Sequence, residues 1–379
     1  MAKEEKKIVT AEDILASYLK DNKSDHYNYV KEVHYRVPTG SLTLDILTGG
    51  GICPGMHRFC GVNEGGKSSA ALELARNFIA SVPKGRVMYI KSEGRLSKEM
   101  EARSGIKFVY SPEEWVAGNC FVFECNLYET VFALIIQLIR ANQEENRYLF
   151  IVDSVDGLQR KADSIKAIGE AEKVAGGAVV CSLFMKRIAL ELQKMGHMCI
   201  MISQVRADIQ LDSYSKEPTR QVTATGGNAL LHWANWIWEF QPRFPTSDWI
   251  LQDPSQKPHH VKNPIIGHRA RIIVKKSPNE TTGRKIEYPI KYGRTGGKSI
   301  WLEYELIEEM GKFGMIEKKA SWIIIPPALI EELKKNKIEI VDKIQGEDNF
   351  RIYLEENPSL TEYLYNRFKK ALGKTNAPA

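Results

Sequence analysis

Residues 61–68 read Gly-Val-Asn-Glu-Gly-Gly-Lys-Ser and match the phosphate-binding pattern G-x-x-x-x-G-K-[ST] in full. The glycines of this pattern allow consecutive backbone N–H groups to turn inward around a phosphate without side-chain clashes. Lys67 can then reach the β- and γ-phosphates, and the Ser68 hydroxyl can bind Mg²⁺. The stretch predicts a nucleoside triphosphate site made of Gly61, Asn63, Glu64, Gly65, Gly66, Lys67, Ser68 and Ser69.

The residues on either side of this loop favour the same interpretation. Residues 56–60 form an apolar lead-in, and residues 69–76 carry apolar side chains at helical spacing. The phosphates would therefore lie at the N-terminus of a helix, where free N–H groups and the helix dipole attract anions. An ordinary glycine-rich turn is the alternative if the loop is taken alone.

Length and composition are those of an ordinary globular protein. The chain has 379 residues, of which 43% are hydrophobic and 26% charged, enough for one large and one small domain. It has no run of about 18 apolar residues and no apolar signal-peptide core at its start, so we expect a cytoplasmic protein. Six dispersed cysteines favour buried thiols over a metal site. The net charge of +6 permits a polyanionic partner without requiring one.

The order of apolar patterns predicts the fold class. Short β-rich runs alternate with helical runs from residue 38 onward. We expect strands at 87–91, 120–124, 148–153, 198–204, 236–240 and 271–274. We expect helices at 68–80, 129–142 and 178–195. This alternation is typical of an α/β fold, in which βαβ units build a mostly parallel sheet covered on both faces.

Both ends of the chain differ from this central part. Residues 9–20 have a capping-box start, Thr10 with Asp13, and carry apolar residues at helical spacing, which predicts a short helix. After residue 298, helical stretches at 302–310, 327–335 and 359–372 with a β-like run at 322–325 predict a small α+β domain. We therefore expect an N-terminal helix and linker at 1–37, a core at 38–298 and a C-terminal domain at 299–379.

Three polar residues at strand ends are candidates for ATP hydrolysis. Asp153 ends an apolar strand, where a carboxylate can help to hold Mg²⁺, and Glu93 follows another strand, where it can polarise a water molecule. Gln204 ends a third strand with a neutral amide that can sense the γ-phosphate. Each residue taken singly is also compatible with a structural or solvated position.

Several segments in the same order resemble the RecA family of DNA recombinases in its bacterial and phage form. Residues 38–47, with the glycines at 49–51, are similar to the segment that precedes the phosphate loop of that family. Residues 223–230, Thr-Ala-Thr-Gly-Gly-Asn-Ala-Leu, are similar to the end of its second DNA-binding loop. Residues 313–322 and 353–358 resemble its C-terminal domain. The resemblance covers about residues 37–372 and implies a RecA-type ATPase core.

The resemblance implies a role for the residues that match the family's motifs. The implied catalytic residues are Lys67, Glu93, Gln204 and Lys275, and the implied Mg²⁺ ligands are Ser68 and Asp153. Glu93 would activate water, and Gln204 would sense the γ-phosphate. Lys275 would reach the γ-phosphate of the next subunit, while Ser277 stands where the family has a second lysine.

Two loops, at 165–174 and 205–224, correspond to the DNA-binding loops of the family. Both combine cations with small, apolar or aromatic residues, which suits a single-strand site. A loop of about 20 residues inside a compact domain is unusual unless it is functional, although a surface loop without a ligand is the alternative. The candidate DNA contacts are Lys166, Lys173, Arg206, Tyr214, Lys216, Arg220, Gly226, Gly227 and Asn228.

The chain also departs from the family pattern. Ser97 and Met100 stand near the aspartate and tyrosine that hold adenine in bacterial members, and Leu231 and His232 replace a lysine and a phenylalanine. The acidic tail usual in bacterial members is replaced by residues 374–379, Lys-Thr-Asn-Ala-Pro-Ala. These differences suggest a diverged, phage-encoded copy with altered base selectivity.

The resemblance implies a DNA-dependent ATPase that uses ATP and Mg²⁺ for homologous recombination. Copies of the chain would form helical filaments on single-stranded DNA and exchange strands with double-stranded DNA, in the cytoplasm at the nucleoid. Single-strand-binding and loader proteins would be further partners. Two alternatives stay open: a ring-forming helicase or repair ATPase of the same superfamily, and an ATP-gated coat for single strands that hydrolyses little.

Overall fold

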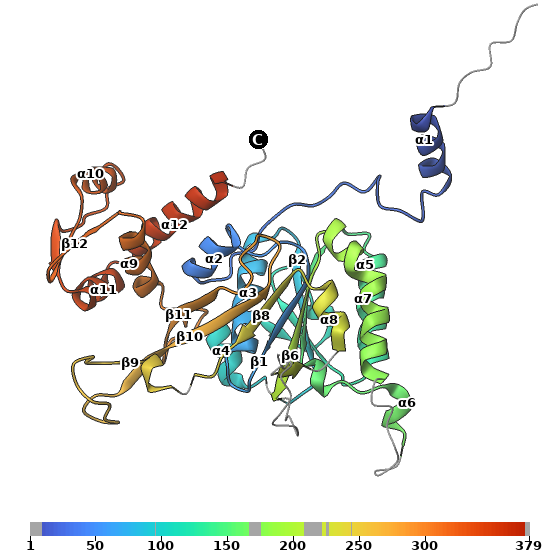
Figure 1. Ribbon diagram of the computed structural model, residues 1–379, viewed down its shortest axis with the longest axis horizontal. Coiled ribbons are helices and arrows are strands. Elements are labelled where there is room, and N and C mark those ends of the chain that lie inside the picture. Colours follow the sequence, from blue (N-terminus) through green and yellow to red (C-terminus); the bar gives the residue numbers. More distant parts are fainter. Residues whose placement is uncertain are drawn as a thin grey trace, which may run out of the picture.

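The computed structural model describes residues 10–94, 96–166, 176–207, 222–224, 227–243 and 245–375. A large twisted sheet lies at the centre, with helices on both faces and a smaller three-stranded sheet to one side (Figure 1). The fold class is α/β, as the alternating sequence pattern predicts. Within the described residues, no helix is both long and apolar enough to cross a membrane.

The central sheet is parallel except at one edge and at one short strand in its middle, β7 (Val222–Ala224), which is described below. Its parallel strands lie in the order β3 (Phe108–Val109), β4 (Cys120–Glu124), β2 (Gly85–Lys91), β5 (Arg147–Asp153), β6 (Met198–Ala207), β1 (Gly55–Gly61) and β8 (Trp236–Phe240). The antiparallel edge consists of β10 (Ile265–Lys276), β11 (Lys285–Lys291) and the short β9 (Trp249–Leu251). Because the parallel strands share one direction, their carboxyl ends meet at one edge, where α/β sheets bind ligands.

Alternate side chains of the parallel strands build a separate core on each face of the sheet. On one face, residues such as Tyr89 and Ile151 pack with α3 (Lys67–Ser81). On the other face, residues such as Phe150 and Met201 pack with α5 (Tyr128–Arg140) and α7 (Gly176–Lys194). A strand that is buried on both faces reads as a continuous apolar run, which is why β5 can be recognised in the sequence.

The predicted core elements agree with the observed ones to within about three residues, with one exception. The strand expected at 271–274 is the end of the much longer β10, Ile265–Lys276. Its first half contains Gly267, His268 and Arg269, so it lacks the continuous apolar run that marks β5. The helices α2 (Leu42–Thr48), α4 (Lys98–Ser104), α6 (Lys161–Ser164) and α8 (Gly227–Trp233) are too short for a periodic signal.

The C-terminal part of the chain has a third hydrophobic core of its own. Four helices, α9 (Leu302–Lys312), α10 (Pro327–Lys335), α11 (Glu347–Glu356) and α12 (Pro358–Thr375), surround a sheet of β12 (Glu317–Lys319), β13 (Trp322–Ile324) and β14 (Lys343–Gln345). The helix α11 was not predicted, because its N-cap, Gly346, offers no capping side chain and the helix buries only Phe350 and Leu354. A domain boundary at residue 299 stays a prediction.

The N-terminal helix α1 (Ala11–Asp21) starts at the predicted capping box, in which Thr10 and Asp13 bond each other's backbone N–H groups. None of its residues is buried. Figure 1 shows α1 away from the sheet, joined to it by an extended stretch of chain. Its apolar side chains belong to none of the three hydrophobic cores of the described residues.

Candidate nucleotide-binding site

The predicted phosphate loop connects the carboxyl end of β1 to the first turn of α3. Gly66 precedes α3 with a φ of 99°, a left-handed conformation that favours glycine. Gly61 has a φ of 140°, and a Cβ atom there would stand 2.2 Å from the carbonyl oxygen of Phe240. Glu64 also adopts a positive φ, 59°, although it is not a glycine. The loop presents the first N–H groups of α3 as an anion site.

Lys67 is held over this loop by the backbone. Its side chain is 7% exposed, and Nζ donates hydrogen bonds to the carbonyl oxygens of Gly61 at 3.0 Å and Val62 at 2.6 Å. A buried ammonium group at the N-terminus of a helix strongly favours an anionic ligand.

Asp153, at the end of β5, lies beside Ser68 of α3. Burial raises the pKa of Asp153, while hydrogen bonds from Ser68 and Tyr89 act to lower it. The Tyr89 hydroxyl donates to Asp153 Oδ2 at 2.5 Å. Hydroxyl and carboxylate oxygens are the ligands that Mg²⁺ prefers, with water and phosphate oxygens completing its shell. The pair Ser68 and Asp153 therefore fits the metal that the family resemblance implies.

Glu93, just after β2, is fixed by the segment that follows Asp153. The Ser154 hydroxyl donates to Glu93 Oε1 at 2.5 Å, and the Ser92 hydroxyl donates to the Ser154 carbonyl oxygen at 2.5 Å. Gly157 packs so closely that a Cβ atom there would stand 2.7 Å from Glu93 Cγ. These contacts hold the Glu93 side chain against the segment that follows β5.

A cavity of about 840 Å³ brings together the predicted catalytic and metal-binding residues except Lys275, which does not line it. Its lining includes Lys67, Ser68, Glu93, Asp153 and Gln204. Gln204 lies beside the phosphate loop because it pairs with Gly61 in the ladder between β6 and β1. Cavities of this size enclose small organic ligands such as nucleotides. The loop residues Asn63, Glu64, Gly66 and Ser69 also line it.

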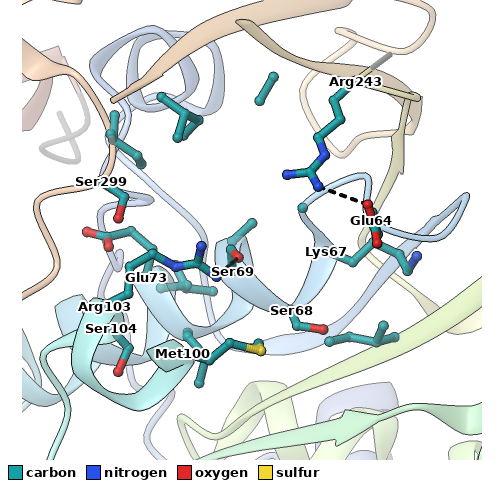
Figure 2. Close-up of a pocket in the computed structure, with 18 of the residues that line it drawn as sticks. Glu64, Lys67, Ser68, Ser69, Glu73, Met100, Arg103, Ser104, Arg243 and Ser299 are labelled. Atoms are coloured by element: carbon teal, nitrogen blue, oxygen red, sulfur yellow. Dashed lines mark hydrogen bonds and ion pairs between the residues drawn. The ribbon is translucent and has the colours of Figure 1, made fainter. Parts of the chain in front are cut away.

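The cavity lining also includes residues that the sequence did not identify. Arg243 follows β8, and Figure 2 shows its guanidinium group directed to Glu64, with an ion pair of 2.8 Å. Arg103 and Ser104 come from α4, and Tyr292 and Ser299 from the stretch after β11. These residues have no common spacing in the sequence, so only the fold relates them.

The two positions that depart from the family's adenine site have different surroundings. Met100 lines the cavity (Figure 2). Ser97 caps α4, because its hydroxyl accepts a hydrogen bond from the Met100 N–H at 3.3 Å. Of these two residues, Met100 lines the cavity and Ser97 does not.

The two neighbouring lysines at the end of β10 differ in their contacts. Lys275 Nζ forms an ion pair of 3.0 Å with Glu239, and its side chain is half exposed. Lys276 Nζ donates to the carbonyl oxygens of Leu231 and His232 at 3.0 and 2.7 Å, and burial lowers its pKa. Lys276 is thus bound to its own subunit, while a reach of Lys275 to a neighbouring subunit stays a prediction.

The expected second DNA loop begins and ends in a strand pair. The end of β6 pairs antiparallel with β7 (Val222–Ala224), with Val205 opposite Ala224 and Arg206 opposite Thr223. The loop predicted at 205–224 is therefore shorter than expected, because three residues at each end belong to a hairpin. Gly227 and Asn228 begin α8. The candidates Tyr214, Lys216, Arg220 and Gly226 lie outside the described residues.

The first predicted DNA loop is described only at its start. Lys166 Nζ forms an ion pair of 2.7 Å with Asp163, which also binds Arg160 at 2.6 Å. These two cations hold the pKa of Asp163 low, at about 2. Lys173 lies outside the described residues. A DNA-binding role for either lysine stays a prediction.

Comparisons with known proteins agree with this geometry. A family model described as the RecA N-terminal domain matches residues 24–241, more than half of the chain. The chain is 25% identical over 340 residues to Protein RecA of Nautilia profundicola, covering 89% of this chain and 83% of that protein. It is 26% identical over 339 residues to Protein RecA of Frankia alni, with coverage of 89% and 84%. It is 27% identical over 350 residues to Protein RecA of Kineococcus radiotolerans, with coverage of 90% and 86%.

Proposed function

This chain belongs to the RecA family, and we propose that it is an ATP-dependent recombinase that forms a helical filament on single-stranded DNA and exchanges that strand with a homologous duplex. The observation that carries the proposal is the course of β6. Gln204 lines the nucleotide cavity, and the next residue, Val205, begins the hairpin with β7 that bounds the predicted second DNA loop. A displacement of Gln204 by a γ-phosphate would therefore reach the DNA-binding segment directly.

ATP hydrolysis is assigned to the residues that share the cavity. Lys67 binds the β- and γ-phosphates, and Glu93 accepts the proton of the attacking water. Gln204 contacts the γ-phosphate. A Mg²⁺ ion held by Ser68 and Asp153 would offset the charge of the phosphates. The bond from Ser154 keeps Glu93 at the position from which it can act on a water.

Assembly of the filament is assigned to α1 and Lys275. Ile14, Leu15 and Tyr18 of α1 are 61%, 58% and 64% exposed. Large apolar side chains on one solvent-facing helix support docking onto another protein surface, here a second copy of the chain. Lys275, half exposed at the end of β10, would reach the nucleotide of that second copy.

Electron microscopy of the purified protein with single-stranded DNA, with and without ATP, tests the proposal. We expect helical filaments on DNA that require ATP, and strand exchange between that DNA and a homologous duplex. The matched control is Lys67→Ala, which should not form ATP-dependent filaments. Closed rings, or ATP-dependent filaments that exchange no strands, would reject the recombinase assignment.

A further inference from the structure

The end of β6 carries a polar cluster that lies next to the nucleotide cavity. The ladder between β5 and β6 stops at Val152 and Met201, while β6 continues to Ala207. The N–H of Gln204 therefore has no acceptor on β5. Asp156 supplies one, because its Oδ2 accepts a hydrogen bond from Gln204 N at 2.7 Å. A buried N–H group without an acceptor would cost free energy, so Asp156 satisfies the strand where β5 ends.

A buried arginine holds the preceding residue of β6. Arg58 of β1 is 1% exposed, and its Nε donates to the hydroxyl of Ser203 at 3.1 Å. Burial lowers the pKa of Arg58, and the nearby Asp156 carboxylate is among the groups that act to raise it. Two oppositely charged residues thus hold the end of β6. Arg58 of β1 binds the Ser203 hydroxyl, and Asp156, in the turn after β5, binds the N–H of Gln204.

The use of charged groups here requires a reason. Asp156 Oδ1 is buried and, within the described residues, has no hydrogen-bond partner. A neutral acceptor would satisfy the Gln204 N–H at a lower cost of desolvation, and a buried charge pair is rarely favourable for stability alone. Neither Arg58 nor Asp156 lines the cavity described above. Charged groups at this place can hold the end of β6 more firmly than neutral ones, because a charge-assisted hydrogen bond is stronger and shorter than a neutral one.

The turn that contains Asp156 also holds Glu93. This turn, η2 (Val155–Gly157), follows Ser154, whose hydroxyl bonds Glu93, and its last residue, Gly157, packs against the Glu93 side chain. One short segment therefore contacts both the candidate base and the backbone of the candidate γ-phosphate sensor. A shift of Gln204 would be transmitted to this segment through the Asp156 carboxylate.

We propose that Asp156 and Arg58 are positioning residues that fix the end of β6 and thereby align Gln204 with Glu93 across the nucleotide site. The proposal rests on the function proposed above, because it assumes that Gln204 senses the γ-phosphate. Asp156 holds the amide of Gln204, and Arg58 holds Ser203 and balances the charge of Asp156. Loss of Asp156 leaves Gln204 present but misaligned.

The test compares Asp156→Ala, Asp156→Asn and the wild type in two measurements. The first is hydrogen exchange of peptides that span residues 201–207, and the second is DNA-stimulated ATP hydrolysis. Asp156→Ala should speed exchange at Gln204 and lower kcat about ten- to hundredfold, as expected of a small misplacement, with KM for ATP nearly unchanged. Asp156→Asn keeps an acceptor oxygen but loses the charge that balances Arg58, so it should recover only part of both effects. Faster exchange with an unchanged kcat would overturn the proposal, as would a loss of ATP binding alone.

A double variant tests the pairing with Arg58. Arg58→Met leaves the Asp156 charge uncompensated and should lower kcat and the melting temperature, whereas adding Asp156→Asn to Arg58→Met should restore part of both. If the losses caused by Arg58→Met and Asp156→Asn simply add in the double variant, the two side chains do not interact and the pairing is rejected. The matched control is Asp253→Asn, a carboxylate bonded within its own loop, which should change neither measurement. If the wild type itself shows no DNA-stimulated hydrolysis, the recombinase proposal fails, and hydrogen exchange alone decides whether Asp156 holds Gln204.

Discussion

The hydroxyl of Ser154 donates a 2.5 Å hydrogen bond to Glu93 Oε1, so the residue that follows the candidate metal ligand Asp153 holds the candidate base. The two carboxylates emerge side by side because β2 and β5 are parallel neighbours, with Lys91 opposite Asp153. Burial raises the pKa of Asp153, and the charge of Glu93 adds to that effect. A cation bound at Asp153 would relieve this repulsion.

Lys67→Ala and Glu93→Gln should separate nucleotide binding from hydrolysis. Lys67→Ala removes a buried charge-assisted contact and should weaken ATP binding about ten- to hundredfold. Glu93→Gln keeps the hydrogen bond from Ser154 through its amide oxygen but cannot accept a proton, so DNA-stimulated hydrolysis should fall about a hundredfold or more with binding retained. Fluorescent-nucleotide titration and phosphate release measure the two effects. Wild-type hydrolysis by Glu93→Gln would disprove the assignment of the base.

Arg206→Ala should weaken binding to single-stranded DNA and leave ATP binding intact. Loss of one phosphate contact should reduce the slope of log affinity against log salt by about one. Fluorescence anisotropy with a labelled oligonucleotide at several salt concentrations gives both quantities. An unchanged affinity and slope would place the DNA site elsewhere on the chain.

Deletion of residues 1–29 should leave a folded monomer. None of the residues of α1 is buried within the subunit, so its removal exposes no core, although the deletion also removes the Tyr27 hydroxyl that donates to Glu191 at 2.8 Å. We expect a cooperative circular dichroism melt at a slightly lower temperature, a monomeric mass by light scattering, and no filaments on DNA with ATP. If the truncated protein still forms filaments, α1 does not join the subunits.

Lys275→Ala should lose DNA-stimulated hydrolysis while each subunit still binds ATP. A cation at the transferring phosphate can change the rate by orders of magnitude. Mixing this variant with Glu93→Gln should restore part of the activity, because one type of interface then pairs an intact Glu93 with an intact Lys275. Lys276→Ala is the control, since Lys276 binds carbonyl groups of its own subunit. No recovery in filaments shown to contain both variants would argue against a shared site.

Glu305 should make the stability of the protein fall as the pH rises from about 4.5 to 7. This fully buried carboxyl group of α9 accepts hydrogen bonds from Ser41, Leu42 and Thr43, and burial raises its pKa to about 7 from 4.5. The folded state therefore keeps a proton that the unfolded state releases in this range, so the free energy of unfolding decreases by up to about 1.4 kcal/mol per pH unit.

Chemical unfolding of the wild type and Glu305→Gln at pH 5 and pH 8 checks this. The stability of the wild type relative to Glu305→Gln should decrease between the two pH values, because the glutamine does not ionise. Glu331→Gln, at an exposed position of α10, is the control and should show no such change. A constant difference between wild type and Glu305→Gln would contradict the assigned pKa.

The parts of the fold that the sequence predicted are those with a strong local pattern. The phosphate loop requires glycines at fixed spacing, and the capping box at Thr10 needs only residues three apart. Strands such as β5 are buried on both faces and so read as apolar runs. Glu93, Asp153 and Gln204 could be selected because each stands at the end of such a run, although the family resemblance was needed to give them roles.

The sequence by itself determined the α/β class and the phosphate loop, because these depend on residues close together in the chain. Only the tertiary structure decided which distant residues complete the site. Asp156 meets Gln204 across 48 positions, and Arg58 meets Ser203 across 145. Arg243 reaches Glu64 because β8 lies beside β1, a neighbourhood that local periodicity does not specify. The order of the strands brings these groups together. That order is fixed only when both faces of the sheet are packed against their helices at the same time.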